Sequence, residues 1–193
     1  NALTQNGYAQ PAPALASISG NISTHWGAAM PNVPVQLSGG ATASVRTDAS
    51  GNFTFPNLPL GQNYTVTPAR DTNDLNGVST FDLSVINKHV LGVENLDSPW
   101  KIIAADANGS NSVTTIDIVE GRKVILGINA DFPAVPAWRF FPANTTFANP
   151  ANPFSGGLPA GNIQITNLQQ NTTGVNFKGV KVADVNNNAQ GGG

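Results

Sequence analysis

Apolar and polar residues alternate through the first third of the chain. Runs with a period of two occur at residues 18–23, 33–37, 53–55 and 64–66. Such alternation is typical of strands with one buried face, and turns rich in Gly, Asn and Pro separate the runs. This pattern predicts a small β-sandwich over residues 17–69.

The apolar spacing becomes helical in two later segments, residues 82–92 and 117–127. In the first, apolar residues recur at i, i+3, i+7 and i+8 from Leu83, which places them on one face of a helix. The second keeps this face but has Gly121 at i+3, which indicates either a close helix approach or a weak point. A glycine ends each segment, as expected at a helix C-terminus.

A twelve-residue pattern leads into each of these helices, at residues 71–82 and 106–117. Both copies carry oxygen-bearing side chains at positions 1, 3, 9 and 12 and an aliphatic residue at position 8. This is the ligand spacing of an EF-hand-type calcium loop, and calcium takes about six to eight oxygen ligands. The expected metal-site residues are Asp71, Asn73, Leu75, Gly77, Ser79 and Asp82 in the first copy and Asp106, Asn108, Ser110, Ser112, Thr114 and Asp117 in the second.

The first copy departs from the usual spacing. Leu75 at position 5 has no side-chain oxygen, and Asn76 occupies position 6, where glycine is usual. Asp74, Asn76 or water would then supply the missing ligand. Each copy has only two carboxylates at its principal positions. We therefore expect weak binding, suited to the millimolar calcium outside cells.

A duplicated loop and exiting helix, with no helix expected in front of either loop, resembles the dockerin family over residues 70–128. The resemblance implies two calcium ions and a cohesin-like protein partner. Dockerins contact that partner through positions 10 and 11 of each loop. Those positions here are Thr80, Phe81, Thr115 and Ile116, which would equally suit packing against a neighbouring part of the chain.

The alternating region resembles a second family, the carboxypeptidase regulatory-like and Cna-B-like domains. These are prealbumin-type sandwiches used as spacers or stalks in bacterial surface proteins. Residues 17–69 contain no lysine, so the Lys–Asn isopeptide bond of some Cna-B relatives is excluded there. The resemblance is carried by Gly20, Val33, Val35, Leu37, Thr47, Asp48, Gly51, Phe53, Phe55, Leu58, Gly61, Tyr64 and Val66.

Residues 129–186 are rich in proline and aromatic residues. Proline keeps such segments extended or turned and away from central strands. We expect this segment to pack on the other modules and to bury Trp138, Phe140 and Phe141, with short strands in its second half. The predicted fold is therefore mainly β with a small α part: a prealbumin-like sandwich, a dockerin-like loop–helix pair and a Pro-rich, β-containing C-terminal segment.

Both ends of the chain are polar. Residues 1–16 predict an N-terminal arm, which alone would be flexible or would donate a strand to a neighbouring subunit. Residues 187–193 predict a linker. Asp184 opens an asparagine run that resembles the start of another calcium loop. Because no helix follows it, a plain turn is favoured over a metal ligand.

Composition narrows the classes of function. Nine basic and 11 acidic residues give a net charge of −2, and cysteine is absent. There is no basic surface for nucleic acid, no disulfide staple and no apolar run long enough to span a bilayer. The sequence also lacks HExxH, G-x-S-x-G and a cysteine nucleophile, so no enzyme is expected. A neutral, amide-rich surface favours an extracellular place, such as a bacterial cell surface.

Two functions remain. The first is a non-enzymatic structural or adhesive module stabilised by two calcium ions, such as a subunit of a bacterial surface filament or stalk that self-assembles or binds a protein. The alternative is a dockerin-type module that docks a cohesin-like protein or a carbohydrate, for which Trp26, Trp100 and Trp138 would offer a platform. Burial of residues 80, 81, 115 and 116 would exclude docking through them, whereas an exposed symmetric patch would favour it.

Overall fold

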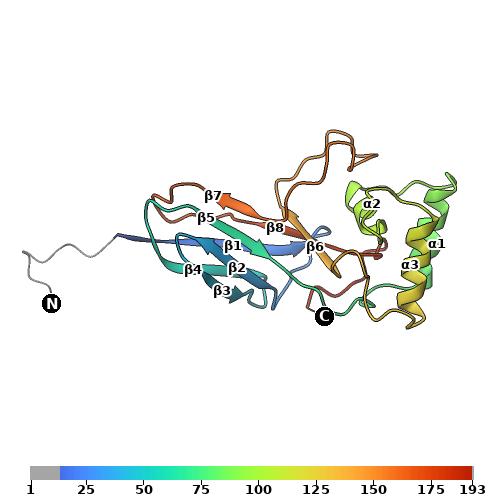
Figure 1. Ribbon diagram of the computed structural model, residues 1–193, viewed down its shortest axis with the longest axis horizontal. Coiled ribbons are helices and arrows are strands. Elements are labelled where there is room, and N and C mark those ends of the chain that lie inside the picture. The colour runs from blue at the N-terminus through green and yellow to red at the C-terminus, as the bar shows by residue number, and fades with distance from the viewer. Residues whose placement is uncertain (1–13, 193) are drawn as a thin grey trace, which may run out of the picture.

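The computed structural model describes residues 14–192, which form eight strands and three helices (Figure 1). The strands make two four-stranded sheets with the orders β4-β1-β8-β6 and β3-β2-β5-β7. The prediction of a mainly β fold with a small helical part is confirmed. The elements are β1 (Leu15–Thr24), β2 (Pro34–Gly39), β3 (Ala43–Arg46), β4 (Asn52–Pro59), β5 (Tyr64–Pro68), α1 (Thr80–Val90), α2 (Pro99–Ala105), α3 (Thr115–Ile125), β6 (Trp138–Pro142), β7 (Ile163–Ile165) and β8 (Phe177–Lys181).

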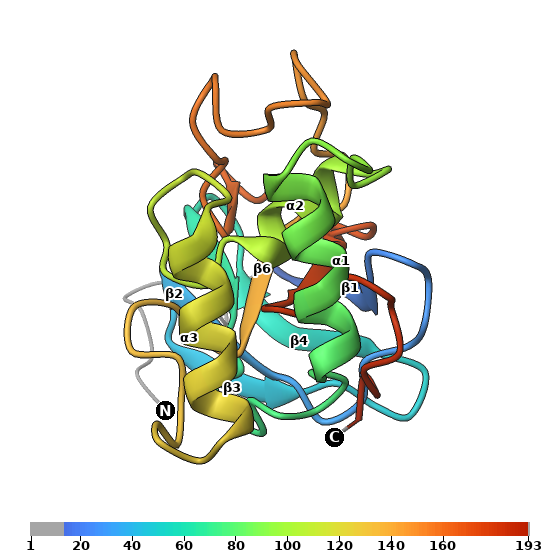
Figure 2. The same cartoon turned by 90° about the vertical axis from the view of Figure 1, so that its right-hand side faces the viewer.

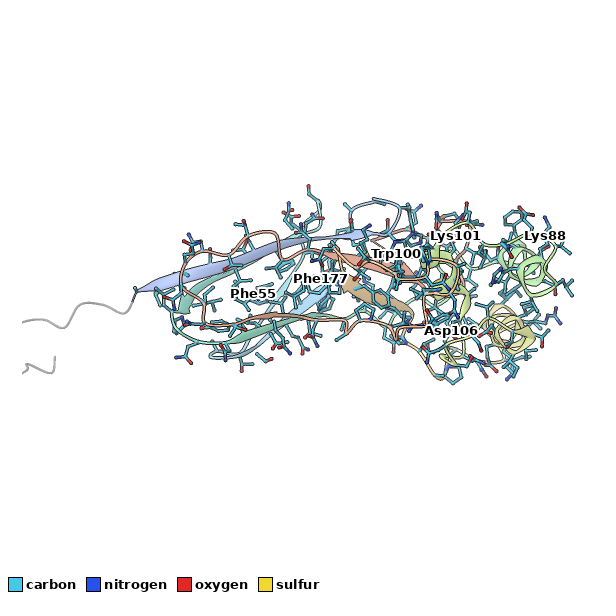
Figure 3. The ribbon with its side chains drawn as sticks, turned by 90° about the horizontal axis from the view of Figure 1, so that it is seen from above. Phe55, Lys88, Trp100, Lys101, Asp106 and Phe177 are labelled. Atoms are coloured by element: carbon cyan, nitrogen blue, oxygen red, sulfur yellow. The ribbon has the colours of Figure 1, made fainter. Side chains whose placement is uncertain are left out.

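The alternating residues of the first third form strands because each strand buries one face. Ile18 and Ile22 of β1 are fully buried, and so are Val35 of β2 and Val66 of β5. Side chains such as Phe55 and Phe177 fill the space between the two sheets (Figure 3). Burial of this apolar layer stabilises the sandwich by about 25 cal/mol for each Å² removed from water.

The sandwich is larger than residues 17–69, because three strands from the C-terminal third complete it. β8 pairs in parallel with β1 and antiparallel with β6, and β7 pairs with β5. β8 thereby covers the edge that β1 would otherwise leave open. The expected burial of Trp138, Phe140 and Phe141 is confirmed, and the strand that carries them lies at a sheet edge, where its terminal proline is tolerated.

Helices α1 and α3 lie side by side at one end of the molecule (Figure 2). A Cβ atom added at Gly121 would lie 2.6 Å from the Leu83 side chain, so this glycine does mark a close helix approach. Gly92 and Gly127 both have φ of +67°, as expected for glycines that follow a helix C-terminus. Among the described helices, none combines the length and the apolar character needed to cross a membrane.

Helix α2 was not expected, since no helix was predicted in front of the second loop. Its start carries two favourable signals: the Ser98 side chain accepts the backbone N–H of Trp100, and Pro99 occupies the first turn. Burial of Ile102 and Ile103 then holds this short helix against the core. Tertiary packing stabilises a helix of seven residues that would not persist alone.

The expected linker at residues 187–193 instead packs on the body of the protein over the residues described. Ala189 is 5% exposed and belongs to the sandwich core. The guanidinium of Arg70 donates to the carbonyl oxygens of Gly191 and Pro31, which holds the segment in place. The predicted N-terminal arm lies outside the described residues up to residue 13.

Candidate metal centre

The second predicted loop folds its carboxylates inward. Asp106 at position 1 and Asp117 at position 12 are both fully buried. The Asp106 carboxylate accepts the backbone N–H of Ser110 at 2.9 Å and that of Asn111 at 3.2 Å. The Asn108 side chain accepts the same Ser110 N–H at 3.0 Å. The backbone is thus wound tightly around the side chains at positions 1 and 3.

The end of this loop is fixed to the first turn of α3. Asp117 Oδ2 accepts the N–H of Thr114 at 2.7 Å, within a capping box formed by these two residues. Asp117 Oδ1 accepts the N–H of Asn108 at 3.1 Å. One carboxylate therefore joins the helix start to position 3 and closes the loop on itself.

The negative charge in this loop is only partly balanced. Within residues 14–192, the sole ion pair made by Asp106 or Asp117 joins Asp106 to Arg139 at 3.5 Å. Burial raises the pKa of Asp106; Arg139 opposes this shift and the Asp117 carboxylate adds to it. Buried carboxylates in such a setting favour either protonation or a bound cation.

The donor set fits a hard cation. Asn108, Ser110, Ser112 and Thr114 add amide and hydroxyl oxygens to the two carboxylates, and calcium prefers oxygen ligands of these kinds. No three His, Cys, Asp or Glu side chains cluster as a metal site anywhere in residues 14–192. A cation here would therefore depend on two carboxylates together with neutral oxygens, as the sequence predicted.

The first predicted loop is arranged differently. Asp71 Oδ1 accepts the backbone N–H of Ala137 at 2.8 Å, and Asp74 Oδ2 accepts that of Phe132 at 2.8 Å. These carboxylates thus hold the connection that follows α3. Leu75 is 51% exposed. The front half of this loop does not wind around its position-1 carboxylate as the second loop does.

A buried lysine lies beside the first loop. Lys181 Nζ donates to the backbone carbonyl of Asp74 at 2.8 Å and to that of Val182 at 3.3 Å. Burial lowers the pKa of Lys181 to about 8, while the carboxylates of Asp74, Asp184 and Asp71 oppose the shift. An ammonium group of the chain itself therefore supplies positive charge close to residues 71–74.

The back half of the first loop matches the second loop. Ser79 precedes α1 as Thr114 precedes α3, and the Ser79 N–H donates to Asp82 Oδ2 at 3.0 Å. Asp82 is fully buried, but its Oδ1 accepts N–H groups from Val185 at 3.1 Å and Asn186 at 3.3 Å. The start of α1 is therefore joined to the C-terminal segment rather than to position 3 of its own loop.

The C-terminal segment that begins at Asp184 is a further candidate for metal binding, which the sequence placed second to a plain turn. Asp184 is fully buried and accepts the N–H groups of Asn187 at 2.8 Å and Ala189 at 2.9 Å. Burial raises the pKa of Asp184, and the Asp82 carboxylate contributes to the same shift. The signal was the Asp-x-Asn-x-Asn spacing; a plain turn was favoured because no helix follows in the sequence. In the fold, the start of α1, which comes much earlier in the chain, lies next to this segment instead.

The four residues expected to meet a partner are all exposed. Thr80 and Thr115 lie at the surface, Phe81 is 61% exposed and Ile116 is 56% exposed. Two further pairs of exposed apolar residues share this relation between the repeats, Leu91 with Leu126 and Val93 with Ile128. The two helices therefore present a repeated set of apolar side chains.

Comparison with known proteins supports the sandwich. The model of the carboxypeptidase regulatory-like domain, a regulatory and non-catalytic kind of module, matches residues 17–91. The match covers the first five strands and α1, which agrees with the family resemblance of the alternating residues.

One curated relative aligns with most of the chain. Chitinase ChiA of Flavobacterium johnsoniae is 26% identical over 185 residues, which cover 83% of this chain and 12% of that protein. The chain thus spans about an eighth of the length of that relative. No solved structure matches the chain.

Proposed function

We propose that this chain is a non-catalytic extracellular module in which calcium fastens a pair of helices to the end of a β-sandwich. The observation that carries the proposal is the loop at residues 106–117, where Asp106 and Asp117 are fully buried and their single ion pair among the described residues joins Asp106 to Arg139. Calcium would supply the missing positive charge and use oxygens that the loop already gathers.

Calcium suits this site better than other common metals. Zinc and copper favour thiolate and imidazole ligands, and the chain has no cysteine and only two histidines. Magnesium requires a nearly regular octahedron of ligands and keeps several waters, whereas calcium accepts irregular sets of carboxylate, amide and carbonyl oxygens. An irregular loop with two carboxylates therefore selects the larger ion.

Weak calcium binding fits a protein outside the cell. Extracellular modules bind calcium with dissociation constants on the order of 10⁻⁴–10⁻³ M, matched to the calcium of their surroundings. Because the chain has no cysteine, a disulfide cannot hold the helix pair in place, and a bound metal ion is the remaining kind of cross-link. A rigid module of this kind suits a stalk or filament subunit at a bacterial surface. The match to the carboxypeptidase regulatory-like domain, a non-catalytic module, supports a structural role of this sort.

Thermal unfolding tests the proposal. In about 10 mM calcium, each occupied site should stabilise the fold by roughly 1–3 kcal/mol, which corresponds to a rise in Tm of about 5 °C over the protein in excess chelator. Asp106→Asn should remove most of the contribution of its own loop. Asp131→Asn, at an exposed position outside both loops, is the charge-matched control and should respond to calcium like the wild type. A Tm that is equal in calcium and in chelator would contradict the proposal.

A second candidate function, protein docking, is favoured by the exposed helix face. Leu83, Ile118 and Leu126 line a groove of about 410 Å³ between α1 and α3, with Arg122 at its side. Phe81 and Ile116, which occupy the same position in the two repeats, are also large apolar residues exposed at the starts of these helices. Aliphatic lining suits a protein surface, whereas sugar platforms use exposed aromatic rings, and the three tryptophans of this chain are buried or half-buried.

A cohesin domain is the partner that this candidate implies, and binding to a panel of recombinant cohesins tests it. Because the two helices repeat one surface, Phe81→Ala and Ile116→Ala should each weaken binding less than the double variant, for which we expect a loss of at least about 100-fold. Lys88→Ala, on the exposed surface of α1, is the control for loss of an unrelated side chain. Equal binding by the double variant and the wild type would exclude docking through this face.

A further inference from the structure

We infer that the second calcium site is shared between the start of α1 and the C-terminal segment, with Asp184, Asn186 and Asn188 as ligands alongside Ser79 and Asp82. These C-terminal residues take the places that the sequence pattern gave to Asp71, Asn73 and Leu75. The inference rests on the proposed calcium function and assigns the residues that hold the second ion.

The charge at this position calls for a cation. Asp82 and Asp184 are both fully buried, and their carboxylates repel each other. Neither forms an ion pair with any residue from 14 to 192. The nearby ammonium of Lys181 is directed to the carbonyl oxygens of Asp74 and Val182. Two enclosed carboxylates without an ion pair are costly unless a cation lies between them or one is protonated.

The C-terminal segment repeats two hydrogen bonds from the first half of the 106–117 loop. The N–H at position 5 donates to the position-3 side chain at 3.1 Å from Asn188 and at 3.0 Å from Ser110. The N–H at position 6 donates to the position-1 carboxylate at 2.9 Å from Ala189 and at 3.2 Å from Asn111. The same donors and acceptors therefore recur with similar distances.

Closure by the position-12 carboxylate also recurs. The N–H of Asn186, at position 3, donates to Asp82 Oδ1 at 3.3 Å, as the N–H of Asn108 donates to Asp117 Oδ1 at 3.1 Å. Position 4 is left-handed in both, with φ of +65° at Asn187 and +69° at Gly109, although position 6 is left-handed only in the second loop, at Asn111. In the continuous first loop, left-handed residues fall at positions 3 and 7 instead. The split arrangement is thus the closer copy of the second loop.

Direct contacts hold the two parts of the shared site together. The side chain of Asn76 donates to the carbonyl of Gln190 at 2.7 Å and accepts its N–H at 2.9 Å. Gly77 lies so close to Ala189 that an added Cβ would approach its backbone to 2.6 Å. The C-terminal segment is therefore fixed against the loop that precedes α1.

The consequence is a mechanical link between the two parts of the molecule. Asp184 follows β8, a strand in the middle of a sheet, and Asp82 lies in the first turn of α1. An ion between them would join the segment after β8 to the start of α1, whereas an ion held by residues 71–82 alone would join only neighbouring parts of the chain. Calcium would then set the stiffness of the junction seen in Figure 1.

Calcium stoichiometry by isothermal titration and native mass spectrometry tests the shared site. The wild type should bind two ions. Asp184→Asn should bind one, and Asp71→Asn, the matched control from the continuous loop, should still bind two. If Asp184→Asn fails to fold, Asn186→Ala combined with Asn188→Ala leaves both carboxylates in place and should weaken the second ion by at least about tenfold. Calcium should also slow amide hydrogen exchange at residues 184–190.

The outcomes separate the two proposals. The shared site would be overturned if Asp184→Asn and the Asn186/Asn188 double variant both still bind two ions. It would also be overturned if Asp71→Asn loses an ion. If the wild type binds a single ion, which is lost in Asp106→Asn but kept in Asp184→Asn, the shared site is overturned while the proposed function stands. A wild type that binds no calcium would instead remove the proposed function.

Discussion

Single residues in this protein acquire their roles from burial. Asp82, Asp106, Asp117 and Asp184 are fully buried, and each accepts backbone N–H groups. An exposed aspartate in a turn, such as Asp48, forms similar bonds to nearby backbone but remains hydrated. The same residue type is therefore a turn former at the surface and a candidate ligand inside, because only the buried carboxylates lack the charge balance that water provides.

His25 should make stability depend on pH between about 4 and 6.5. Burial lowers the pKa of His25 to about 4, helped by Lys101 and Lys178, and its ring contacts Trp26 and Trp100. Between these two pH values the unfolded state takes up the proton more readily than the folded state, so stability falls as pH falls. The loss at pH 4 should be about 3 kcal/mol, since each unit of pKa difference corresponds to about 1.4 kcal/mol. Denaturant unfolding of wild type and His25→Gln across this range measures it, and equal slopes for the two proteins would contradict the prediction.

Gly77→Ala should destabilise the protein by about 2 kcal/mol or more. Gly77 has φ of +75°, and an added Cβ would lie 2.6 Å from the backbone of Ala189. Gly92→Ala is the matched control, since φ is +67° and no atom lies within 4 Å of the added Cβ. It should cost only about 1 kcal/mol, the ordinary price of a left-handed alanine. Urea unfolding compares the two, and equal losses would show that the contact with Ala189 is unimportant.

At the scale of elements, helices α1 and α3 each have one face in the core and one face exposed. The buried face of α1 carries Leu83 and Ile86, and α3 contributes Ile118 and the close contact at Gly121. The opposite faces keep large apolar residues in water. A helix that exposes apolar side chains on its outer face is typical of an interaction surface rather than of a core element.

The two faces of α1 should differ sharply on truncation. Ile86 is fully buried, so Ile86→Ala should lower the free energy of unfolding by about 2–4 kcal/mol through lost contacts and a cavity. Leu91 is 65% exposed, and Leu91→Ala should change it by less than about 0.5 kcal/mol. Chemical denaturation gives both values. A large loss at Leu91 would mean that this face is covered in the folded protein.

At the scale of the whole molecule, the sandwich depends on both ends of the chain. β1 to β5 come from the region matched by the family model, and β6 to β8 come from beyond the helices. The helices are therefore an insertion between strands of one sandwich and not a module attached after it. This topology couples the helical end to the core through β8 and α2, which are in contact.

A chain that ends at residue 128 should not fold cooperatively. It keeps the matched region and both predicted loops but loses β8 and β6, which complete the sheet beside β1, and β7 at the edge of the other sheet. The exposed edge of β1 and an open core would follow. Calorimetry and near-ultraviolet circular dichroism, with the full chain as control, measure this. A sharp transition of the shortened chain would show that the sandwich is complete without its C-terminal strands.

Much of the local structure was predictable because its determinants are local. Alternation located most of the strands but not β6, which was expected only as a buried Pro-rich segment; helical spacing located α1 and α3, and glycines marked their ends. Helix α2 was missed because its seven residues are stabilised by the core and not by their own periodicity. The burial of Trp138, Phe140 and Phe141 followed from their apolar character.

The sequence by itself determined the type of most elements, the β-sandwich and the oxygen-rich spacing of the candidate calcium loops, since these depend on residues close together in the chain. Tertiary structure alone decided which segments share a sheet and which carboxylates meet. Asp184 and Asp82 are about a hundred residues apart in the chain, yet the bonds from Val185 and Asn186 join them. Their closeness depends on the position of β8 in the sandwich, and the spacing of residues along the sequence does not reveal that position.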